Sequence, residues 1–496
     1  MLEYDINELL NQAGIGLWNA KFLLVWLYCF FITFETNSFT YLHYKKNHGL
    51  HCNDDTFDAI SNETVNDGTT LEDICNQENL SWILPSVFVT FALIFSIIVD
   101  RFGRKQTLMI VTIAQVALIL SSLQTFSSNS FLSYLVHCIG LVLKELQFYG
   151  ILILLCECST KSNRAIFLYV SYFLYTVINT HLESYADLSI IKNDKTLAIC
   201  VALTLTVELY LLWKVIDESP RWLLQKQRFK ETANLIEKIF KENKSQLQTA
   251  VNEVINEMAT LKFDDKNRNS IFCCDWNLCA LLTTKNAILQ MITLAVNWYA
   301  IQMLFLVFSE DVETEQAVIF KIINFSFVVI VFVLQYFIAN KFGRKLAFQT
   351  SIISTISLCV FLKFLNSLID TSNFLTKIGM PLFYYLRSAA EGSLFILSTE
   401  CLPTIVRASG MAFAYACVFP VSMLNHLLLH SLNDLWFYTI IVPSLIVVLM
   451  ASMLLPETLN NEIPDDIEEY HLQTSNVSKP QNVRQKPESE LIASFI

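Results

Sequence analysis

Ionisable side chains occur inside several long apolar stretches of this 496-residue chain. In the stretch at 377–399, Tyr384, Arg387 and Glu391 follow one another at short intervals, and Ser398 continues the same pattern. At ~100° per residue, these four side chains fall within roughly 60° of one another on a helix. Charged groups in an apolar interior are costly unless they are paired or hydrated. The stripe therefore predicts either a polar cavity wall or an internal Arg387–Glu391 ion pair.

Two further stretches carry polar side chains on one helical face. Lys144 and Gln147 share a face of the stretch at 131–155, and Lys144 could meet a charged ligand or pair with Glu145 or Glu208. Additional candidates for a cavity wall are polar or aromatic residues of three other stretches, namely Asn37, Tyr172, Tyr415 and Phe419. Aromatic stripes are also common in ordinary packing, so both interpretations stay open here.

The composition identifies the elements that must position these residues. The chain is 54% hydrophobic and only 16% charged, which excludes a typical soluble protein. Apolar blocks of about 20 residues are each long enough to cross a hydrocarbon core. Twelve spans are expected, near 22–42, 81–99, 107–126, 131–155, 165–185, 196–216, 286–308, 317–339, 346–365, 377–399, 408–430 and 435–455. The sequence predicts a multi-pass helical protein whose first partner is the lipid bilayer.

The distribution of Lys and Arg predicts the orientation. Basic residues are concentrated in the segments after the second, fourth, sixth, eighth and tenth spans, and the opposite loops carry few of them. The positive-inside rule then places both termini in the cytoplasm. The net charge of −11 identifies no partner, because the acidic residues are concentrated in the first outer loop and the C-terminal tail.

The first outer loop, about 43–80, has the features of an extracellular segment. It contains Cys52 and Cys75, which predict one disulfide, and the sequon at Asn62, which predicts one glycan. A second cysteine group on the inner side lacks the paired cluster of a structural zinc site, so no metal is expected.

The most informative feature is an internal repeat. Residues Asp100–Lys105 read Asp-Arg-Phe-Gly-Arg-Lys, and Asn340–Lys345 read Asn-Lys-Phe-Gly-Arg-Lys half the chain later. A Glu-Cys pair with a following Arg also occurs twice, as does a Pro/Glu motif at the end of the sixth and twelfth spans. The repeat predicts two parallel six-helix halves, at 22–216 and 286–456.

The repeated motifs suggest a gate between these halves. Gly permits a tight turn, and its flanking cations can pair with acids at helix ends. Ion pairs that close one face and break on opening would form a bistable element, although the same residues could serve only as topological anchors. The gating candidates are Asp100, Arg101, Gly103, Arg104, Lys105, Glu157, Arg164, Glu218, Arg221, Gly343, Arg344, Lys345, Glu400, Arg407 and Glu457.

These motifs resemble the major facilitator superfamily and, within it, the organic cation, anion and zwitterion transporters. The narrower resemblance rests on Glu218–Leu224 (Glu-Ser-Pro-Arg-Trp-Leu-Leu), on Glu400–Thr404 (Glu-Cys-Leu-Pro-Thr) with Arg407, and on the Pro-Glu-Thr motif around Glu457 with the acidic segment after Ile463. The resemblance implies facilitated or exchange transport of small organic ions by alternating access. It also implies that Trp298 and Tyr299 line the cavity, where aromatic faces can hold an organic cation.

Several residues depart from the family pattern. Ser96 replaces a Gly, Asn340 replaces an acid, and Phe419 and Tyr384 stand where related carriers place charges. Substrate charge therefore does not follow from the resemblance. These departures motivate an alternative function, a transport-deficient sensor or interaction protein on the same fold, with a channel as a third possibility.

The expected organisation has five segments. These are a cytoplasmic N-terminus (1–21), an N-terminal six-helix bundle (22–216), a partly helical central loop (217–285), a C-terminal six-helix bundle (286–456) and a largely disordered cytoplasmic tail (457–496). The sequence shows no ATP-binding loop, metal cluster or nucleophile elbow. We therefore expect an all-α transporter in the plasma membrane with no cofactor, no nucleic-acid partner and no enzymatic activity.

Overall fold

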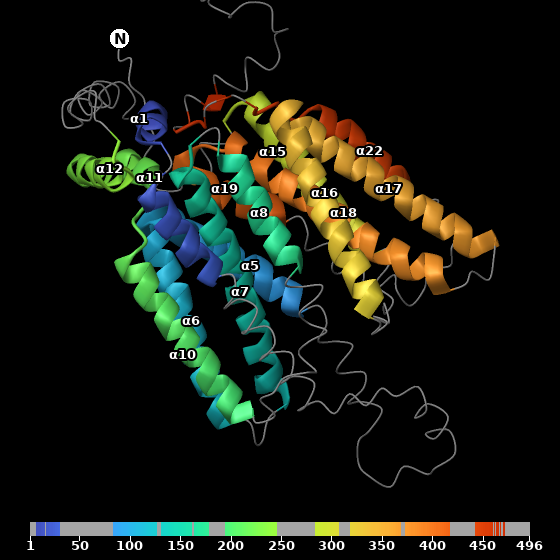
Figure 1. Ribbon diagram of the computed structural model, residues 1–496, viewed down its shortest axis with the longest axis horizontal. Coiled ribbons are helices and arrows are strands. Elements are labelled where there is room, and N and C mark those ends of the chain that lie inside the picture. Colours follow the sequence, from blue (N-terminus) through green and yellow to red (C-terminus); the bar gives the residue numbers. More distant parts are fainter. Residues whose placement is uncertain are drawn as a thin grey trace, which may run out of the picture.

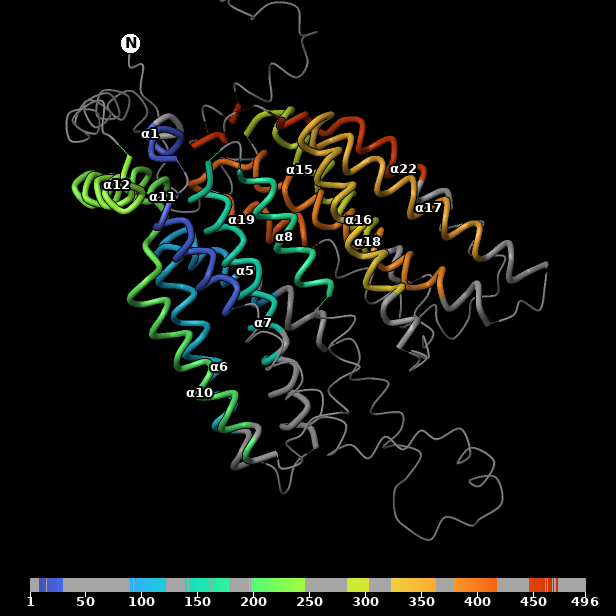
Figure 2. Tube along the Cα trace, in the orientation of Figure 1, coloured from blue at the N-terminus to red at the C-terminus, as the bar shows by residue number. Residues whose placement is uncertain are grey.

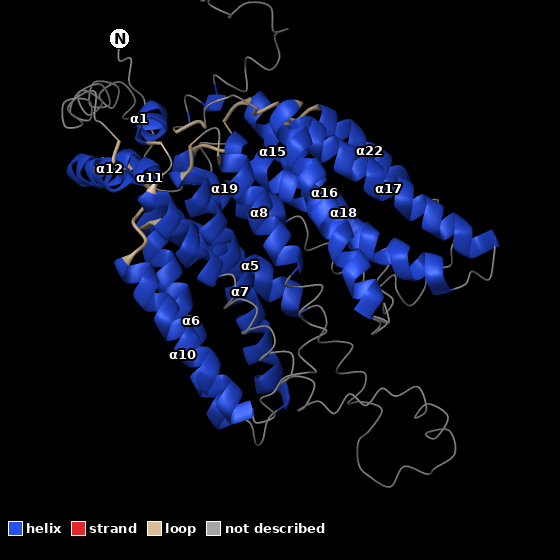
Figure 3. Ribbon diagram, viewed as in Figure 1, coloured by secondary structure: helices blue, strands red, loops and turns tan. Residues whose placement is uncertain are grey.

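A computed structural model describes most of both halves of the chain. The described residues are 6–14, 16–29, 83–125, 130–160, 163–177, 194–245, 283–306, 318–368, 373–416, 442–459, 461, 463–465, 467 and 470–471. Asn37, Cys52, Asn62, Cys75 and Phe419 lie outside them. Within the described part, all regular structure is helical (Figure 3).

The N-terminal half consists of long helices that follow the predicted apolar stretches. A short helix α1 (Ile6–Ala13) precedes the apolar helix Leu17–Cys29. The remaining helices of this half are α5 (Ile83–Phe102), α6 (Arg104–Thr125), α7 (Ser130–Cys158), α8 (Arg164–Val177) and α10 (Asp194–Lys214).

The C-terminal half repeats this arrangement. Its helices are α15 (Lys285–Leu306), α16 (Val318–Lys341), α17 (Arg344–Leu368), α18 (Asn373–Cys401), the 3₁₀ turn η2 (Thr404–Val406), α19 (Arg407–Ala416) and α22 (Val442–Met453). Figure 1 shows the two halves side by side, with α6 and α10 at one flank and α17 and α22 at the other.

Helices α5 and α8 of the first half contact helices α16, α18 and α19 of the second half. Helix α5 packs against α19, and α8 packs against α16 and α18. The tube in Figure 2 shows α8 lying beside these helices of the opposite half. The contact therefore follows the internal repeat, because α5 and α8 correspond to α16 and α19 in the two copies.

The outer surfaces of both halves are apolar. Many large hydrophobic side chains are exposed there, including Leu24, Ile94, Ile110, Leu203, Leu334, Phe337 and Phe361. Among the described residues, Ile323–Lys341 and Arg344–Leu362 are long and apolar enough to cross a membrane by length and composition alone. Such extended apolar surface is typical of contact with lipid or another apolar partner.

Two short helices of the central loop cover the end of the bundle where the repeated motifs lie. They are α11 (Pro220–Gln225) and α12 (Phe229–Asn243). Ser219 begins α11, and its hydroxyl accepts a hydrogen bond from the Trp222 backbone N–H at 3.2 Å. Helix α12 packs against α1, and Asp217 pairs with Lys238 at 2.7 Å. We call this end of the molecule the motif face.

Candidate functional site

Each half has one tight glycine turn at the motif face, and each turn is closed by a glutamate. Gly103 lies between α5 and α6, and Gly343 lies between α16 and α17. A Glu218 oxygen accepts from the backbone N–H groups of Arg104 at 3.0 Å and Lys105 at 3.3 Å. Burial raises the pKa of the Glu218 carboxyl, and these N–H groups oppose that rise.

The second turn has the same arrangement. Glu457 accepts from the backbone N–H groups of Arg344 at 2.8 Å and Lys345 at 3.2 Å. The Lys105 ammonium donates to the Trp213 carbonyl, and the Lys345 ammonium donates to the Met453 carbonyl. The repeat seen in the sequence is therefore also a repeat of hydrogen bonds.

Asp100 reaches from the end of α5 to the start of α19 in the other half. Its carboxylate accepts from the Ser409 backbone N–H at 2.9 Å and from the Ser409 hydroxyl at 2.7 Å. Because the N-terminus of a helix favours negative charge, Asp100 caps α19 across the contact between the halves. Its counterpart Asn340 stays within its own half and accepts from Arg344 at 2.9 Å.

Arg104 is fully buried and contacts both halves. Its guanidinium lies 3.0 Å from Glu157 and 3.3 Å from Asp100 in its own half. It also donates to the Thr404 carbonyl of the opposite half at 2.7 Å. The side chain is 1% exposed, so these contacts form away from bulk water, where charge pairing is strong.

Two ion pairs cross between the halves in opposite directions. Arg407 of the second half lies 2.7 Å from Glu157 of the first, and Arg164 of the first lies 3.2 Å from Glu400 of the second. All four side chains are buried. Removal of either partner would leave a buried charge with fewer compensating contacts, which is strongly unfavourable.

The segment after α22 joins the same network. Asp465 lies 3.2 Å from Arg221 of α11 and accepts a hydrogen bond from the Thr404 hydroxyl at 2.9 Å. The Thr404 backbone N–H donates to the Pro464 carbonyl at 3.0 Å. Thr404 is thus held by the tail segment and by Arg104 of the first half.

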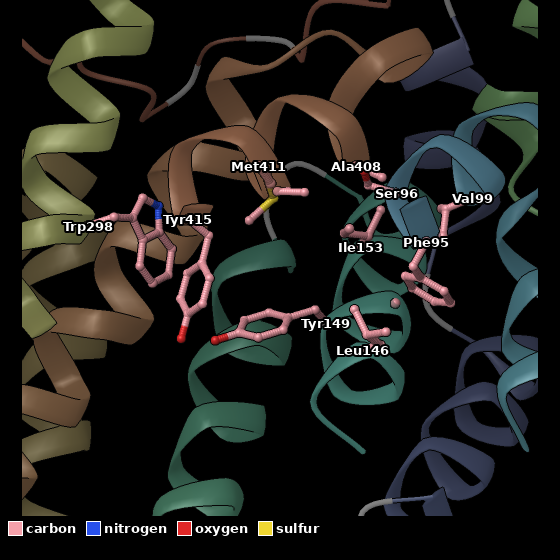
Figure 4. A pocket seen from close by; sticks show the side chains of 12 residues that line it. Phe95, Ser96, Val99, Leu146, Tyr149, Ile153, Trp298, Ala408, Met411 and Tyr415 are labelled. Atoms are coloured by element: carbon pink, nitrogen blue, oxygen red, sulfur yellow. The ribbon is translucent and has the colours of Figure 1, made fainter. Parts of the chain in front are cut away.

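A small cavity lies between the halves, beyond this network. It encloses about 60 Å³ and is almost entirely apolar. Phe95, Ser96, Val99 and Leu146 line it from the first half, and Trp298, Ala408, Met411 and Tyr415 line it from the second (Figure 4). Ligand pockets commonly enclose ~300–1,000 Å³, so this space must widen to admit an organic molecule.

Glu391 and Arg387 lie on α18, and Glu391 is within reach of Tyr149, which lines the cavity. Their side chains are 3.8 Å apart, which is the i,i+4 pair that their spacing allows. The Tyr149 hydroxyl of α7 lies 3.5 Å from the Glu391 carboxylate and could donate a long hydrogen bond to it across the contact between the halves. Arg387 also donates to the Ile301 carbonyl and the Gln302 side chain, both at 3.3 Å.

Aromatic rings from both halves surround the pair. Tyr149 stacks on Phe395 with centroids 5.6 Å apart, and Trp298 meets Tyr415 edge-on at 5.1 Å. Tyr172 is fully buried, and its hydroxyl has no hydrogen-bond partner in the described part of the chain. The site therefore combines a buried carboxylate, an Arg and several π faces, a set that can hold an organic cation or zwitterion.

Lys144 and Gln147 occupy different surroundings on α7. Lys144 lies 3.7 Å from Glu145, whose carboxylate accepts from the Tyr175 hydroxyl at 2.9 Å. Gln147 donates to Glu208, in the interior of the first half. These residues share a helix face, but Lys144 lies over the Tyr175 ring at 5.8 Å, whereas Gln147 meets Glu208.

The remaining sequence-predicted residues are distributed as follows. Trp298 is buried at the cavity, whereas Tyr299 and Tyr384 are half-buried and are not among the residues that line it. Arg101 is exposed beside the first turn. Sequence reasoning missed Tyr149 and Phe395; the aromatic pair at 148–149 in mid-span was the available signal for Tyr149.

Comparison with known proteins agrees with this architecture. The chain resembles the proton:xylose symporter XylE bound to 6-bromo-6-deoxy-D-glucose, with a TM-score of 0.62 over 92% of this chain and 99% of that chain at 15% identity. It also resembles the human organic anion transporter MFSD10, with a TM-score of 0.53 at 10% identity over 87% of this chain and 98% of that one. The molecule therefore has the fold of the major facilitator superfamily.

The family follows from a sequence match over most of the chain. Residues 33–465 match the family described as "Sugar (and other) transporter", and the chain belongs to that family of membrane transporters. Similar proteins include the organic cation transporter protein of Drosophila melanogaster (28% identity; 54% of this chain, 49% of that one) and organic cation/carnitine transporter 2 of Homo sapiens (25% identity; 75% and 64%). The chain thus spans about half of the first of these relatives and slightly less than two thirds of the second.

Proposed function

We propose that this protein is a secondary transporter that carries small organic ions across the membrane by alternating access. The observation that carries the proposal is the reciprocal exchange of buried ion pairs between the halves, Arg407–Glu157 and Arg164–Glu400. The similarity to proteins named as organic cation and carnitine transporters supports organic ions as the substrate class.

The motif face acts as the gate. When the motif face is closed, its buried ion pairs hold the two halves together. When the halves separate, the charged groups are hydrated again, so the network has two stable arrangements. Asp100 and Arg104 add contacts across the same boundary. In this proposal the structure represents the arrangement in which the motif face is closed.

Positive charge supports a cytoplasmic location for the motif face. Lys and Arg accumulate there, which the positive-inside rule associates with the cytoplasm. In the plasma membrane, this orientation places the first long loop outside the cell. There Cys52 and Cys75 would form a disulfide, and Asn62 would carry a glycan. Glycosidase treatment should lower the mass of the unmodified protein and leave the mass of Asn62→Gln unchanged. This result would place the loop on the extracellular side, where N-glycans are attached.

The substrate contacts Glu391 and the surrounding rings. The carboxylate attracts a cationic group, the aromatic faces of Tyr149, Tyr415 and Trp298 stabilise it, and Arg387 can meet a carboxylate of a zwitterion. We expect Glu391→Gln to raise KM for organic cations by about tenfold or more, because a charge-assisted contact of roughly 1.5–3 kcal/mol is lost.

That variant also separates the two interpretations of the α18 stripe. Surface expression of Glu391→Gln should remain close to that of the unmodified protein, and transport of anions should fall less than transport of cations. Equal kinetics for both proteins would assign the Arg387–Glu391 pair a structural role only.

The decisive experiment is an uptake screen with purified protein in liposomes. Radiolabelled tetraethylammonium, L-carnitine and p-aminohippurate represent cations, zwitterions and anions. Saturable uptake of at least one probe is expected, and Asp100→Ala with Arg104→Ala should abolish it without loss of folded protein. If folded protein moves none of the three probes, the transport-deficient sensor becomes the better interpretation; single-channel currents would instead identify a channel.

A further inference from the structure

A second buried carboxyl lies in the interior of the first half, away from the substrate site. Glu208 of α10 is 0% exposed. One carboxyl oxygen accepts from the Gln147 amide of α7, and the Cys29 thiol also contacts the carboxyl. The other oxygen is buried without a hydrogen-bond partner in the described part of the chain.

Among the described residues, the side chains that contact the Glu208 carboxyl are the neutral Gln147 and Cys29. Helix α6 packs against α10, and its only charged residues, Arg104 and Lys105, lie at its start. The helix Leu17–Cys29 brings Cys29 and Tyr28, whose hydroxyl donates to the Thr204 carbonyl. Helix α7 brings Lys144, which pairs with Glu145 at 3.7 Å. Besides Glu208, the ionisable side chains of α10 are Cys200, the exposed Tyr210 two residues after Glu208, and Asp194, Lys195 and Lys214 at the helix ends.

An ionised carboxylate in such surroundings is costly, because two neutral contacts replace its full hydration shell. Addition of one proton removes the charge and turns the carboxyl into a neutral hydrogen-bonding group. The proton adds to the carboxylate oxygen, and no other bond is formed or broken. We infer that Glu208 is a proton-binding site whose occupancy biases the two arrangements of the halves.

A short path connects this site with the contact between the halves. Gln147, the partner of Glu208, lies on α7 two residues before Tyr149. Tyr149 in turn approaches Glu391 of α18 and stacks on Phe395 of the same helix. Deprotonation of Glu208 would draw water or a cation toward it and displace Gln147. A shift of α7 then changes the packing against α18.

This inference deepens the proposed transport function, since a proton bound at Glu208 would couple substrate movement to a proton gradient. Its first test does not depend on transport. Infrared difference spectra of the full-length protein in lipid nanodiscs should show a carboxylic acid C=O band that disappears as pH is raised. Glu208→Gln should lack this band, and Glu237→Gln, an acid-to-amide change on the exposed face of α12, should retain it.

The second test measures the bias on the two arrangements. Spin labels are placed at positions 101 and 341, two exposed sites at the ends of α5 and α16. The populations of short and long distances should shift with pH, by up to ~tenfold in their ratio per pH unit for one coupled proton. The same ratio should be independent of pH in Glu208→Gln and should follow the unmodified protein in Glu237→Gln.

The outcomes separate this inference from the transport proposal. A band that persists in Glu208→Gln, or a distance ratio with the same pH dependence in both proteins, would overturn the inference even if uptake is robust. A ratio that responds to replacement of sodium by potassium, and not to pH, would overturn the assignment to a proton. If both readouts depend on Glu208 while no probe is taken up, the proton site stands and the transport proposal fails.

Discussion

Glycine is required at positions 103 and 343 for two reasons. Both residues have positive φ, +113° and +125°, a region that other residues avoid. A Cβ atom at either position would also lie 2.4 or 2.3 Å from a carboxylate oxygen of Glu218 or Glu457. These two glycines therefore permit the tight turn that each half has between its helices.

We expect Gly103→Ala and Gly343→Ala each to destabilise the closed protein by ~1–3 kcal/mol, as backbone strain of this kind usually costs. Thermal unfolding of the purified protein measures the effect. Gly410→Ala is the matched control, because its added Cβ would meet only the flexible Leu402 side chain at 3.1 Å. A glycine variant as stable as this control would contradict the steric account.

The buried pair Arg407–Glu157 provides a second prediction at this scale. Arg407→Ala should lower the free energy of unfolding by ~3–5 kcal/mol, because Glu157 then keeps only Arg104 as its cation. The pair Arg228–Glu231 is the control, since it is shorter at 2.6 Å but exposed. Glu231→Gln should cost less than ~1 kcal/mol. Similar losses in both variants would show that burial does not govern these pairs.

The partners of single residues were only partly predictable. The spacing and sign of the motif residues indicated that Glu157 and Glu400 would meet arginines, and they do. The sequence could not show that each glutamate meets one arginine of its own half and one of the opposite half, because this depends on how the halves are rotated. Nor could it show that Asp100 caps α19 while Asn340 bonds only within its own half.

At the scale of elements, the segment after α22 is part of the contact network at the motif face. It connects α11 of the central loop to η2 of the second half through Asp465, and Tyr470 is buried a few residues further on. The segment was recognised in the sequence by its acidic pattern alone. Its contact partners lie more than 50 residues away along the chain, so no local signal could identify them.

Asp465→Ala should release this segment. The Thr404 amide, now bonded to the Pro464 carbonyl, should exchange its hydrogen at least about tenfold faster, which corresponds to ~1.4 kcal/mol of lost protection. Hydrogen exchange with mass spectrometry on the peptide that contains Thr404 measures this rate. Glu237→Gln, on the exposed side of α12, should leave the rate unchanged. An unchanged rate in Asp465→Ala would mean that the tail does not restrain η2.

Helix packing also explains which site residues the sequence revealed. The stripe on α18 was visible because polar side chains in an apolar helix are conspicuous. Phe395 was invisible, since a Phe in a membrane span is as readily a lipid contact as a cavity residue. Helical periodicity defines the faces of a helix but not the neighbour that each face meets. The contacts of Tyr149 on α7 with Phe395 on α18 and Tyr415 on α19 are therefore visible only in the structure.

At the scale of the whole molecule, the two halves repeat the same turns but differ in how they hold each other. The first half contributes Asp100 as a cap and Arg104 as a donor across the boundary, whereas Arg344 lies 3.7 Å from Glu400 within its own half. Of the two glycine-turn motifs, the first thus adds contacts across the boundary to those of the ion pairs Arg407–Glu157 and Arg164–Glu400. Opening of the motif face requires these contacts to break together.

The distance between the two halves at the motif face tests this account most directly. Spin labels at positions 101 and 341 should report a short distance in the unmodified protein, and a second, longer distance when a transported substrate is present. Glu157→Ala with Arg407→Ala should favour the longer distance without substrate. A single distance that neither substrate nor loss of these ion pairs changes would contradict the proposal that the halves alternate around a gate at the motif face.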